Sequence, residues 1–514
     1  SRNAEALLAV LVASPTPAGM RVASAWLGDP AIADRAAAAV VSIGEAIVES
    51  AHRMEVAEAM GDVIAACGVP EVLRRADRLR REAWRPLNLA RLAEVSSPDD
   101  LEADGASGPD QAAVDGNPQT YWDETDHQPM YRFRLTFADP VEVSALRMQG
   151  YAFQVHSPKD YAVLCDGREV AVVRDAEYDP QTNQTVTGWP ACRCRELELA
   201  ISGSYGPSPA IRELEVYHFP SPAEPRLRWR QTGDSLALLN HDRLVWQHNH
   251  GRALRRPCMH PVATLEGDEL TALCPADHDW HFALWFSWNA INGVDYWATT
   301  PEAAGRTTIR QVRVMPAEDF SARIELDLDY HPQGEAPVMT EHRVVAVSPP
   351  EPDGSYRIEW TGRFTALGQD LELKGGSHGG GYAGLAFRAS TESRGWTVID
   401  SQGRLDRPEG GFGRATHGQT ARWMDFGLIS GQRVRPAGLA MFDHPDNIRH
   451  PAPWFVLLNE KVPFGYLNPA PLFAEPLRLE AGKSLQLRYA ILVHSGTAQP
   501  ASLDGRWREW EQPR

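Results

Sequence analysis

The chain is short of cysteine, of positive charge and of long apolar runs. Six cysteines in 514 residues are too few for a disulfide scaffold. The formal net charge of -17 argues against a nucleic-acid partner, because phosphate binding needs clustered Lys and Arg. No apolar run approaches the roughly 20 residues that span a bilayer. The sequence therefore predicts neither a nucleic-acid-binding protein nor a membrane span.

The cysteines leave the redox compartment open. Cys192 and Cys194 would share one face of a strand, at a spacing that suits neither a metal site nor a mutual disulfide. Cys258 and Cys274 flank one short segment, so a disulfide between them and two free thiols are both open alternatives. The chain begins Ser-Arg-Asn without a methionine. We interpret it as a mature or excised piece, for which a removed signal peptide is one explanation.

The periodicity of apolar residues divides the chain into parts. The length exceeds one hydrophobic core, and 43% hydrophobic residues are typical of a folded protein. Up to residue 85, helical spacing and three Gly/Pro-rich breaks predict about four helices. After it the period changes to 2, which predicts strands, and the Pro-rich stretch 219–225 predicts a stiff linker. We expect three separate folding units: residues 1–85, 86–218 and 226–500.

The helical part contains one turn with a known parallel. Leu27-Gly28-Asp29-Pro30, followed by an Ala-rich helix, resembles the turn of a HEAT-type repeat. Repeats of that type bury their faces only against neighbours, so the resemblance implies the tail of a longer solenoid and a protein partner for this segment. A plain helical bundle is the alternative.

The middle part carries a series of motifs in a fixed order. They are Asn88-Leu89-Ala90, Gly108-Pro109, Ala113 to Trp122, Pro158 to Tyr161, Asp166-Gly167, and Ile211 to Val216. In this order they resemble the discoidin, or coagulation factor 5/8 type C, family, which implies a β-sandwich of the galactose-binding type. Family members commonly bind sugars or anionic surfaces through loops at one end, where Tyr151, Phe153 and Tyr205 offer aromatic rings. A spacer that binds nothing is the alternative.

The same resemblance implies a calcium site. In the family, the loop before the conserved Trp often holds calcium against a Glu near the last strand. Here that implicates Asp115, Thr120 and Glu213, whose oxygen ligands suit a hard cation. The alternative is a loop that caps the sandwich without metal.

The last part concentrates His, Asp, Asn and Trp in three loop regions. These are 257–261 with 277–297, then 341–343 with 379–385, and finally 442–447 with 450–454. Together they resemble the bacterial DUF6807 family of unassigned function, some members of which are labelled methane oxygenase. That reaction belongs to a membrane-embedded copper enzyme, which this chain does not resemble. The chain departs from the family at Phe282-Ala283, where Arg-Gly is more frequent, so an anchoring cation is missing.

In strand pattern and size the family looks like the galactose-mutarotase supersandwich, which is an analogy of fold and fixes no reaction. We therefore expect a multidomain protein: an α-helical repeat segment, a discoidin-like β-sandwich and a large antiparallel β-supersandwich. Loops rich in His, Asp and Trp are typical of sites rather than of cores.

Several residues of the last part are candidates for chemistry. A His pair with nearby acids can move protons near neutral pH or hold a divalent metal. An acid that shares a strand face with an Arg would stay ionised. Trp rings offer faces for sugars, although Trp in a sandwich more often belongs to the core. Our catalytic candidates are His278, His281, Glu341, Asp295, Asp443 and His444, and our substrate-binding candidates are His260, Trp285, Asn292, Trp297, Arg343, Tyr382, Asn447 and Trp454.

The sequence predicts a carbohydrate-active enzyme, a glycoside hydrolase or lyase, acting on a polysaccharide or oligosaccharide without a catalytic cofactor. The domain resemblance places it outside the cytoplasm, secreted or periplasmic. A non-catalytic glycan-binding or scaffold protein is the alternative, favoured by the missing Arg-Gly, and a metal-dependent redox role is a third. We expect His278 or His281 in an accessible cleft, because burying a charge-rich loop would leave polar groups without partners.

Overall fold

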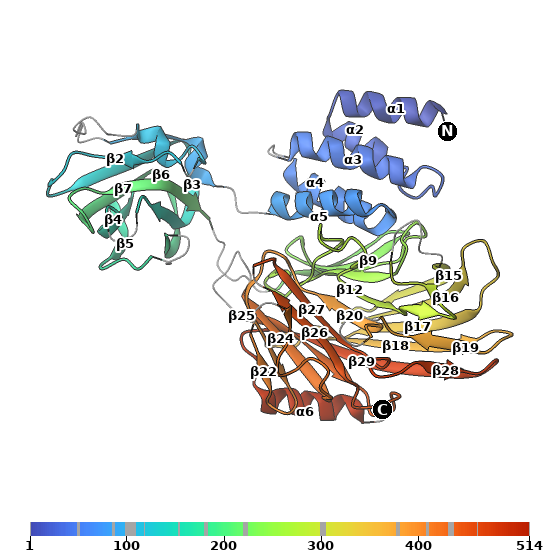
Figure 1. The fold of residues 1–514 in the computed structure, drawn as a ribbon. Helices are drawn as coiled ribbons and strands as arrows, with labels where there is room; N and C mark the ends of the chain where they lie inside the picture. Colours follow the sequence, from blue (N-terminus) through green and yellow to red (C-terminus); the bar gives the residue numbers. More distant parts are fainter. Residues whose placement is uncertain are drawn as a thin grey trace. The chain divides into compact units, whose positions relative to one another are not determined.

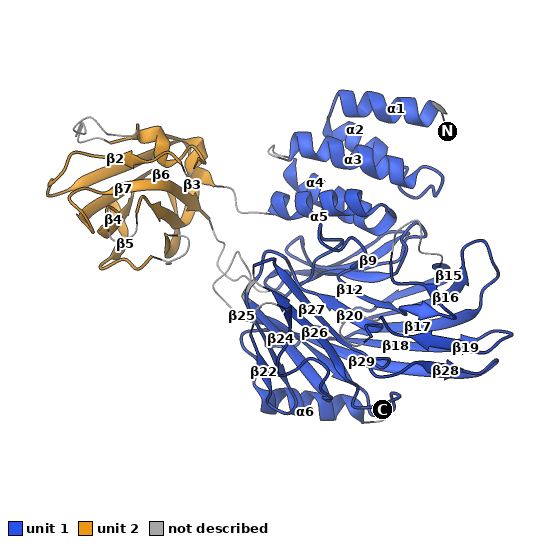
Figure 2. Cartoon of the chain, in the orientation of Figure 1, with its two compact units in different colours: residues 1–84, 225–514 blue, residues 85–224 orange. Residues whose placement is uncertain are grey.

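The chain folds into two compact units, Ser1–Trp84 with Pro225–Arg514, and Arg85–Glu224 (Figure 2). We took the fold from a computed structural model. It describes residues 2–48, 52–84, 88–97, 109–117, 119–152, 155–178, 183–218, 225–298, 305–376, 381–407, 411–429, 436–459 and 461–512. Most of the predicted linker, residues 219–224, and Phe153 lie outside these ranges.

Five helices form the N-terminal segment (Figure 1). The Thr16 hydroxyl caps the second helix by accepting from Gly19 N, and Pro17 occupies its first turn, where a missing N–H costs nothing. The sequence analysis did not predict that one helix ends at Ile47 and the next begins at Arg53. The likeness to a HEAT repeat stays a prediction. The helices are α1 (Arg2–Ala13), α2 (Pro17–Ser24), α3 (Ala33–Ile47), α4 (Arg53–Ala66) and α5 (Pro70–Trp84).

The second unit is an antiparallel β-sandwich with strand order β2-β7-β3-β6-β4-β5 and with β1 beside β3. Trp122 is fully buried in its core, packed edge-on against Phe133. Its elements are η1 (Leu89–Leu92), β1 (Ala93–Ser96), η2 (Asp110–Ala113), β2 (Trp122–Asp123), β3 (Tyr131–Gly150), β4 (Pro158–Cys165), β5 (Arg168–Val173), β6 (Gln184–Ser204) and β7 (Ala210–Tyr217).

The larger unit contains a sandwich of two nine-stranded sheets and a four-stranded sheet. The helix-covered sheet consists of β23 (Gly411–Phe412), β26 (Trp454–Asn459), β27 (Phe464–Pro469), β20 (Gly384–Arg388), β12 (Leu284–Ser287), β11 (Cys258–Val262), β10 (Arg243–Asn249), β9 (Ser235–Asn240) and β8 (Leu227–Gln231).

The opposite sheet pairs strands that are long and mostly consecutive in the sequence. It consists of β15 (Gly305–Pro316), β16 (Ala322–Pro332), β17 (Met339–Val347), β18 (Tyr356–Ala366), β29 (Ser484–Ser495), β25 (Pro436–Asp443), β24 (Trp423–Ile429), β21 (Arg394–Asp400) and β22 (Leu405–Asp406). The small sheet consists of β14 (Val294–Asp295), β13 (Ala290–Ile291), β19 (Leu371–Lys374) and β28 (Leu477–Leu479). The predicted fold class is thus confirmed, while the likeness to galactose mutarotase stays a prediction.

The main hydrophobic core lies between the two nine-stranded sheets. Successive side chains of a strand point to opposite faces. On β12, Phe286 stacks on Trp360 of the opposite sheet at a centroid distance of 4.6 Å, whereas Trp285 belongs to the cluster under the helices. The helix α6 (Pro500–Glu511) covers the outer face of the opposite sheet through Trp507 and Trp510.

The helical segment, which we expected to fold separately, forms one unit with the sandwich. Ala, Val and Leu side chains of α3 to α5 share one hydrophobic cluster with Trp285, Phe282 and Tyr466. Polar contacts cross the same boundary, since the Gln247 amide donates to Gly61 O at 3.0 Å. The helices therefore bury part of the outer face of the sheet and share a core with it.

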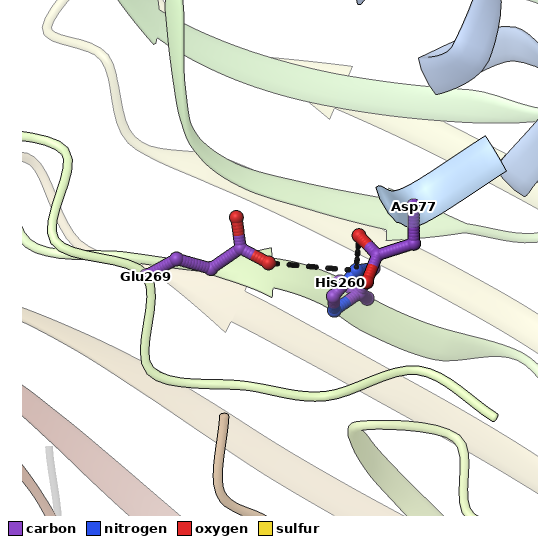
Figure 3. Close-up of side chains that lie close together, drawn as sticks. All are labelled: Asp77, His260 and Glu269. Carbon is purple, nitrogen blue, oxygen red and sulfur yellow. Dashed lines mark hydrogen bonds and ion pairs between the residues drawn. The ribbon is translucent and has the colours of Figure 1, made fainter. Parts of the chain in front are cut away.

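A charged network ties α5 to the sheet (Figure 3). His260 Nε2 lies 2.7 Å from Asp77 Oδ1, and both side chains are buried. Arg80 donates from Nη2 to Asp77 at 2.8 Å and to Glu269 at 2.7 Å. Burial alone would raise the pKa of Asp77, but the charges of Arg81, His260 and Arg80 outweigh it and hold that pKa well below its usual range. The network stays charged and fastens the helices in place.

Two further findings concern the whole chain. All six cysteines are free thiols, so the alternative of a Cys258–Cys274 disulfide is not adopted. Among the helices within the described ranges, none is both long enough and apolar enough to cross a membrane.

We predict that replacing Arg80 with Met destabilises the larger unit by about 3–5 kcal/mol, because it leaves the buried Asp77 and the half-buried Glu269 short of a partner. Arg78→Met is the matched control, since the Arg78 side chain is 63% exposed and Glu45 also bonds to Arg75. It should cost less than about 1 kcal/mol. Urea unfolding measures the free energy of unfolding of both variants. Equal losses would show that the buried network contributes no more stability than an exposed ion pair.

Candidate functional site

The predicted site residues of the sandwich do not meet in one place. Five separate environments hold most of them: the interior between the sheets, the loop after β25, the boundary with α5, the β13–β14 hairpin, and the loop before β12. Among the predicted histidines in these environments, His278 in the last one is the most exposed.

Glu341 and Arg343 lie in the interior of the sandwich, which corrects their predicted roles in catalysis and substrate binding. Both side chains are almost fully buried and form a two-pronged ion pair at 2.6 and 2.9 Å. The Tyr330 hydroxyl donates to the same carboxylate, and the Arg343 guanidinium lies over Trp360 at 5.4 Å. With every strong group already paired, we interpret the cluster as a structural element of the core.

Asp443, His444 and Asn447 organise the loop that follows β25. The fully buried Asp443 carboxylate accepts from His450 Nδ1 at 2.8 Å, from Ala452 N at 2.9 Å and from the Asn447 amide at 2.7 Å. His444 is buried against Trp510, and burial lowers its pKa. The catalytic role predicted for Asp443 and His444 and the binding role predicted for Asn447 do not fit this arrangement, because the contacts hold the loop itself.

His260 is covered completely by α5, which corrects its assignment to substrate binding. Asp77, His260 and Glu269 bring their ligand atoms within 4.8 Å of one another, as a metal site would. Arg80, however, already bonds to both carboxylates at 2.7–2.8 Å, so a guanidinium stands where the cation would be. With Arg81 also 3.2 Å from Asp77, the charges are balanced without a metal.

Three of the predicted sugar-stacking residues are core residues. Trp285, Trp297 and Trp454 are at most 5% exposed, so their faces are not available to a ligand. Asn292 and Asp295 shape the hairpin of β13 and β14 instead. The φ angles of Asn292 and Gly293 are 49° and 78°, the left-handed conformation that a two-residue hairpin turn requires, and Asp295 accepts from Trp297 N at 2.6 Å.

The loop before β12 brings His278 to the surface. Its side chain is 33% exposed and stacks on the buried His281, with ring centroids 4.6 Å apart. Asp277 lies beneath it, 3.3 Å from His278 Nδ1 and 2.7 Å from Nη2 of the fully buried Arg388. His278 is the accessible one of the two imidazoles, with His281 stacked on it, while the cleft that we expected around it stays a prediction.

The electrostatics of this loop assign different protonation states to its groups. Burial, together with the charges of Arg388, His278 and Arg256, lowers the pKa of His281 well below its ordinary value, so that ring is neutral at pH 7. Burial raises the pKa of Asp277, but His278 and Arg388 outweigh it and bring that pKa to about 2. An ionised carboxylate therefore holds an exposed imidazole, which is the arrangement of a proton-transfer pair.

Aromatic rings surround this pair. Trp280 lies edge-on to His278 at 4.9 Å, and Phe464 does so at 4.8 Å. Farther along, the half-buried Tyr382 contacts Trp297 at 4.9 Å and Phe455 at 5.5 Å. The binding role predicted for Tyr382 is compatible with this position, and Trp280, one of the Trp rings expected to offer a face to sugars, is also half-buried.

Two arginines that sequence reasoning missed complete the site. Arg388 is the single charged residue of the otherwise apolar β20. A lone charge in an apolar strand is a pattern from which the sequence analysis could have predicted a site residue. Arg256 lies over the Phe282 ring at 5.5 Å, so a cation is present beside the position where the family more often has Arg. Ala283 has a φ of 65°, a conformation that favours the family's glycine.

The second unit has a separate candidate surface where its loops meet. Tyr121 and Tyr151 lie 4.3 Å apart, the Arg212 guanidinium covers Tyr151 at 4.8 Å, and His156 meets the same ring edge-on at 6.1 Å. A neighbouring cavity of about 580 Å³ is lined by His127, Gln128, Pro129, Tyr131, Ser202, Gly203, Ser204, Gly206 and Pro207. The hydroxyl of Tyr205 donates to Ala176 O, which ties that ring to the module itself.

The residues predicted to bind calcium fit a hard cation. Thr120 Oγ1 lies 2.9 Å from Asp115 Oδ2. Glu213 is 9% exposed, and its Oε1 is buried without a hydrogen-bond partner. Burial and the neighbouring Asp115 raise the pKa of Glu213 to about 7. The positive charge of Arg91 lowers the pKa of Glu213, but by less than these two effects raise it. An orphaned carboxylate oxygen beside a second carboxylate is the donor set that a divalent cation would satisfy.

The solved structures that resemble this chain include two carbohydrate-binding modules, each of which matches about a quarter of it. A chitosan-binding module of a Paenibacillus sp. IK-5 chitosanase/glucanase is 15% identical, with a TM-score of 0.23, over 26% of this chain and 100% of the module. A family 32 carbohydrate-binding module of Clostridium perfringens NanJ, solved with galactose, is 17% identical, with a TM-score of 0.22, over 26% of this chain and 98% of the module. At these scores neither ligand nor activity follows.

Comparison with curated proteins finds no match. A match to DUF6807, described as a family of unknown function, extends from residue 235 to residue 508. It covers most of the sandwich and reaches α6, and it includes all three loop regions that the sequence analysis singled out. Because this match spans more than half of the 514 residues, the protein belongs to the DUF6807 family.

Proposed function

We propose that the protein is a carbohydrate-active enzyme of the hydrolase or lyase type, with its site at His278 on the outer face of the helix-covered sheet. The observation that carries the proposal is the surface imidazole of His278 beside the ion pair that Asp277 forms with the fully buried Arg388. Half-buried Trp280 and Tyr382 supply aromatic faces of the kind that pack on sugar rings. His278 is the proton-transfer group, and the neutral His281 beneath it keeps its ring in position.

A non-catalytic glycan-binding protein is the second candidate, and a specific observation favours it. Two of the acids proposed for catalysis are buried and paired, Glu341 with Arg343 and Asp443 with His450. In that case recognition would rest on the loop end of the second unit, where Tyr121, Tyr151 and Arg212 gather. Under either candidate a secreted or periplasmic location, where glycans are met, is part of the proposal.

We also propose that calcium binds between Asp115, Thr120 and Glu213 as a structural ion of the second unit. The ion would neutralise two adjacent carboxylates and stiffen the turn before Trp122. It would take no part in the chemistry at His278, for which no metal is proposed.

The first prediction from this proposal concerns catalysis. Replacing His278 with Gln should lower the turnover of an oligosaccharide substrate by about 10²–10⁴-fold, because a general acid or base contributes that much. The melting temperature should hardly change, since the side chain is partly exposed. Product release is measured by chromatography across a panel of neutral and acidic oligosaccharides. His342→Gln, at a 51% exposed imidazole, is the control. Full activity in the His278 variant would contradict the assignment.

The second prediction concerns the loop end of the second unit. Tyr151→Ala should weaken glycan binding about tenfold or more, because it removes the ring that Tyr121 and Arg212 contact. A glycan array followed by calorimetry measures the effect. Val172→Ala, at an exposed strand position of the same unit, should leave binding unchanged. Equal binding by both variants would remove Tyr151 from the site.

The third prediction concerns calcium and pH. The pKa of Glu213 in the folded, calcium-free protein is about 7, above its unfolded value. The stability that protonated Glu213 contributes is therefore lost as pH rises through 7. Calcium should reverse that loss: at pH 7.5 and a hundredfold excess over Kd it should add about 2.7 kcal/mol to the free energy of unfolding and thereby raise the melting temperature. Glu213→Gln should abolish the response, whereas Glu215→Gln should keep it. A response that survives in the Glu213 variant would place the ion elsewhere.

A further inference from the structure

A group of buried hydrogen-bond donors lies on the outer face of the helix-covered sheet, under His278. Arg388 on β20 is paired with Tyr466 on β27, and Trp285 on β12 is paired with Ala386, two residues before Arg388. Because side chains alternate along strands, these three large side chains point to the same face. The His281 ring lies 5.2 Å from both the Trp285 and the Tyr466 rings.

Several hydrogen-bond donors of this group have no acceptor within reach. Arg388 is fully buried, and its Nη2 donates to Asp277 and to Pro463 O, but its Nε and Nη1 have no partner. Trp285 Nε1 and the Tyr466 hydroxyl are also buried without partners. Buried polar groups in native proteins are almost always satisfied, and an unsatisfied set in one place points to a missing ligand, water or ion.

The charge in the same region is unbalanced toward positive. Arg256 is 5% exposed and donates to backbone carbonyls, among them Trp280 O and Tyr296 O. In the described part of the chain, Asp277 is the one carboxylate that forms an ion pair with Arg388 or Arg256. Burial lowers the pKa of Arg256, and the charge of the exposed Asp295 offsets that effect only in part. An uncompensated buried cation is unfavourable, so a negative ligand would stabilise this arrangement.

We propose that Arg388, Tyr466 and Trp285 form a subsite for the carboxylate of an acidic sugar, which makes a uronate-containing oligosaccharide the substrate class. A carboxylate offers two oxygens with about four acceptor positions, enough for the donors left free on these three side chains. Its bonds to a guanidinium are charge-assisted and stronger than those of a neutral ligand. The sugar enters beside His278, the exposed member of the group. This inference rests on the proposed function, since it names the substrate of that same site.

The test compares each uronate with its own methyl ester, which keeps the sugar and removes the charge. Calorimetry on the full chain would use trimers of galacturonate, mannuronate and glucuronate and their methyl esters. We expect one acid form to bind at least about tenfold tighter than its ester, from a charged hydrogen bond. Arg388→Met should abolish that preference. Sodium acetate, which carries the carboxylate without the sugar, should not compete at the same concentration.

Because Arg388→Met can fail to fold, the decisive variant is Tyr466→Phe, which removes only the hydroxyl. Tyr489→Phe is its matched control, since that hydroxyl is also buried without a partner but lies in the main core. Tyr466→Phe should weaken binding of the acid form about tenfold and leave the ester unchanged, while Tyr489→Phe changes neither.

Two results would overturn the subsite while leaving glycan binding intact: equal affinity for acid and ester, or an acid preference that survives in Tyr466→Phe. Acetate that competes as well as the trimer would overturn the sugar part of the inference. Failure to bind any glycan of the neutral and acidic panels would instead overturn the proposed function, and the inference would fall with it.

Discussion

Burial of both faces of one sheet is the constraint on which the larger unit depends. A sheet with a solvated outer face can leave polar side chains to water, but here α4 and α5 cover part of that face and every polar group under them needs a partner. The Asp77–His260 contact at 2.7 Å and the Arg80 bonds to Asp77 and Glu269 meet this need. Ion pairs as well as apolar packing therefore hold the helices on the sheet. The partly exposed His278 lies where the helices do not cover the sheet.

The same constraint separates structural acids from functional ones. Glu341 and Asp443 look like catalytic carboxylates by residue type, yet each is saturated by partners within its own cluster. Asp277 also has partners, but they connect a buried guanidinium to a surface imidazole. A group can exchange protons with a ligand only if it reaches solvent, and His278, 33% exposed and 3.3 Å from Asp277, does so.

Much of this arrangement could be predicted from local patterns. Period-2 segments such as 324–330 became strands, the change near residue 85 marks the first boundary between the units, and Asn292-Gly293 became a hairpin turn. The loop containing His278 was predicted as a site and holds the exposed imidazole. The stacking role expected for Trp285 does not fit, because alternation along β12 shows that Trp285 and Phe286 face opposite ways but not which of those faces other segments cover.

The sequence by itself determined the elements, their order and the concentration of His, Asp and Trp in a few loops, because these follow from spacing along the chain. Only the tertiary structure decided which of those residues reach a ligand, because exposure depends on segments far apart in sequence. Asp77 meets His260 across 183 positions, and Arg388 meets Asp277 across 111. No local pattern encodes such meetings: they arise when α5 packs on β11 and when β20 lies beside β12, and the low dielectric of the resulting interior then decides which charges must be paired.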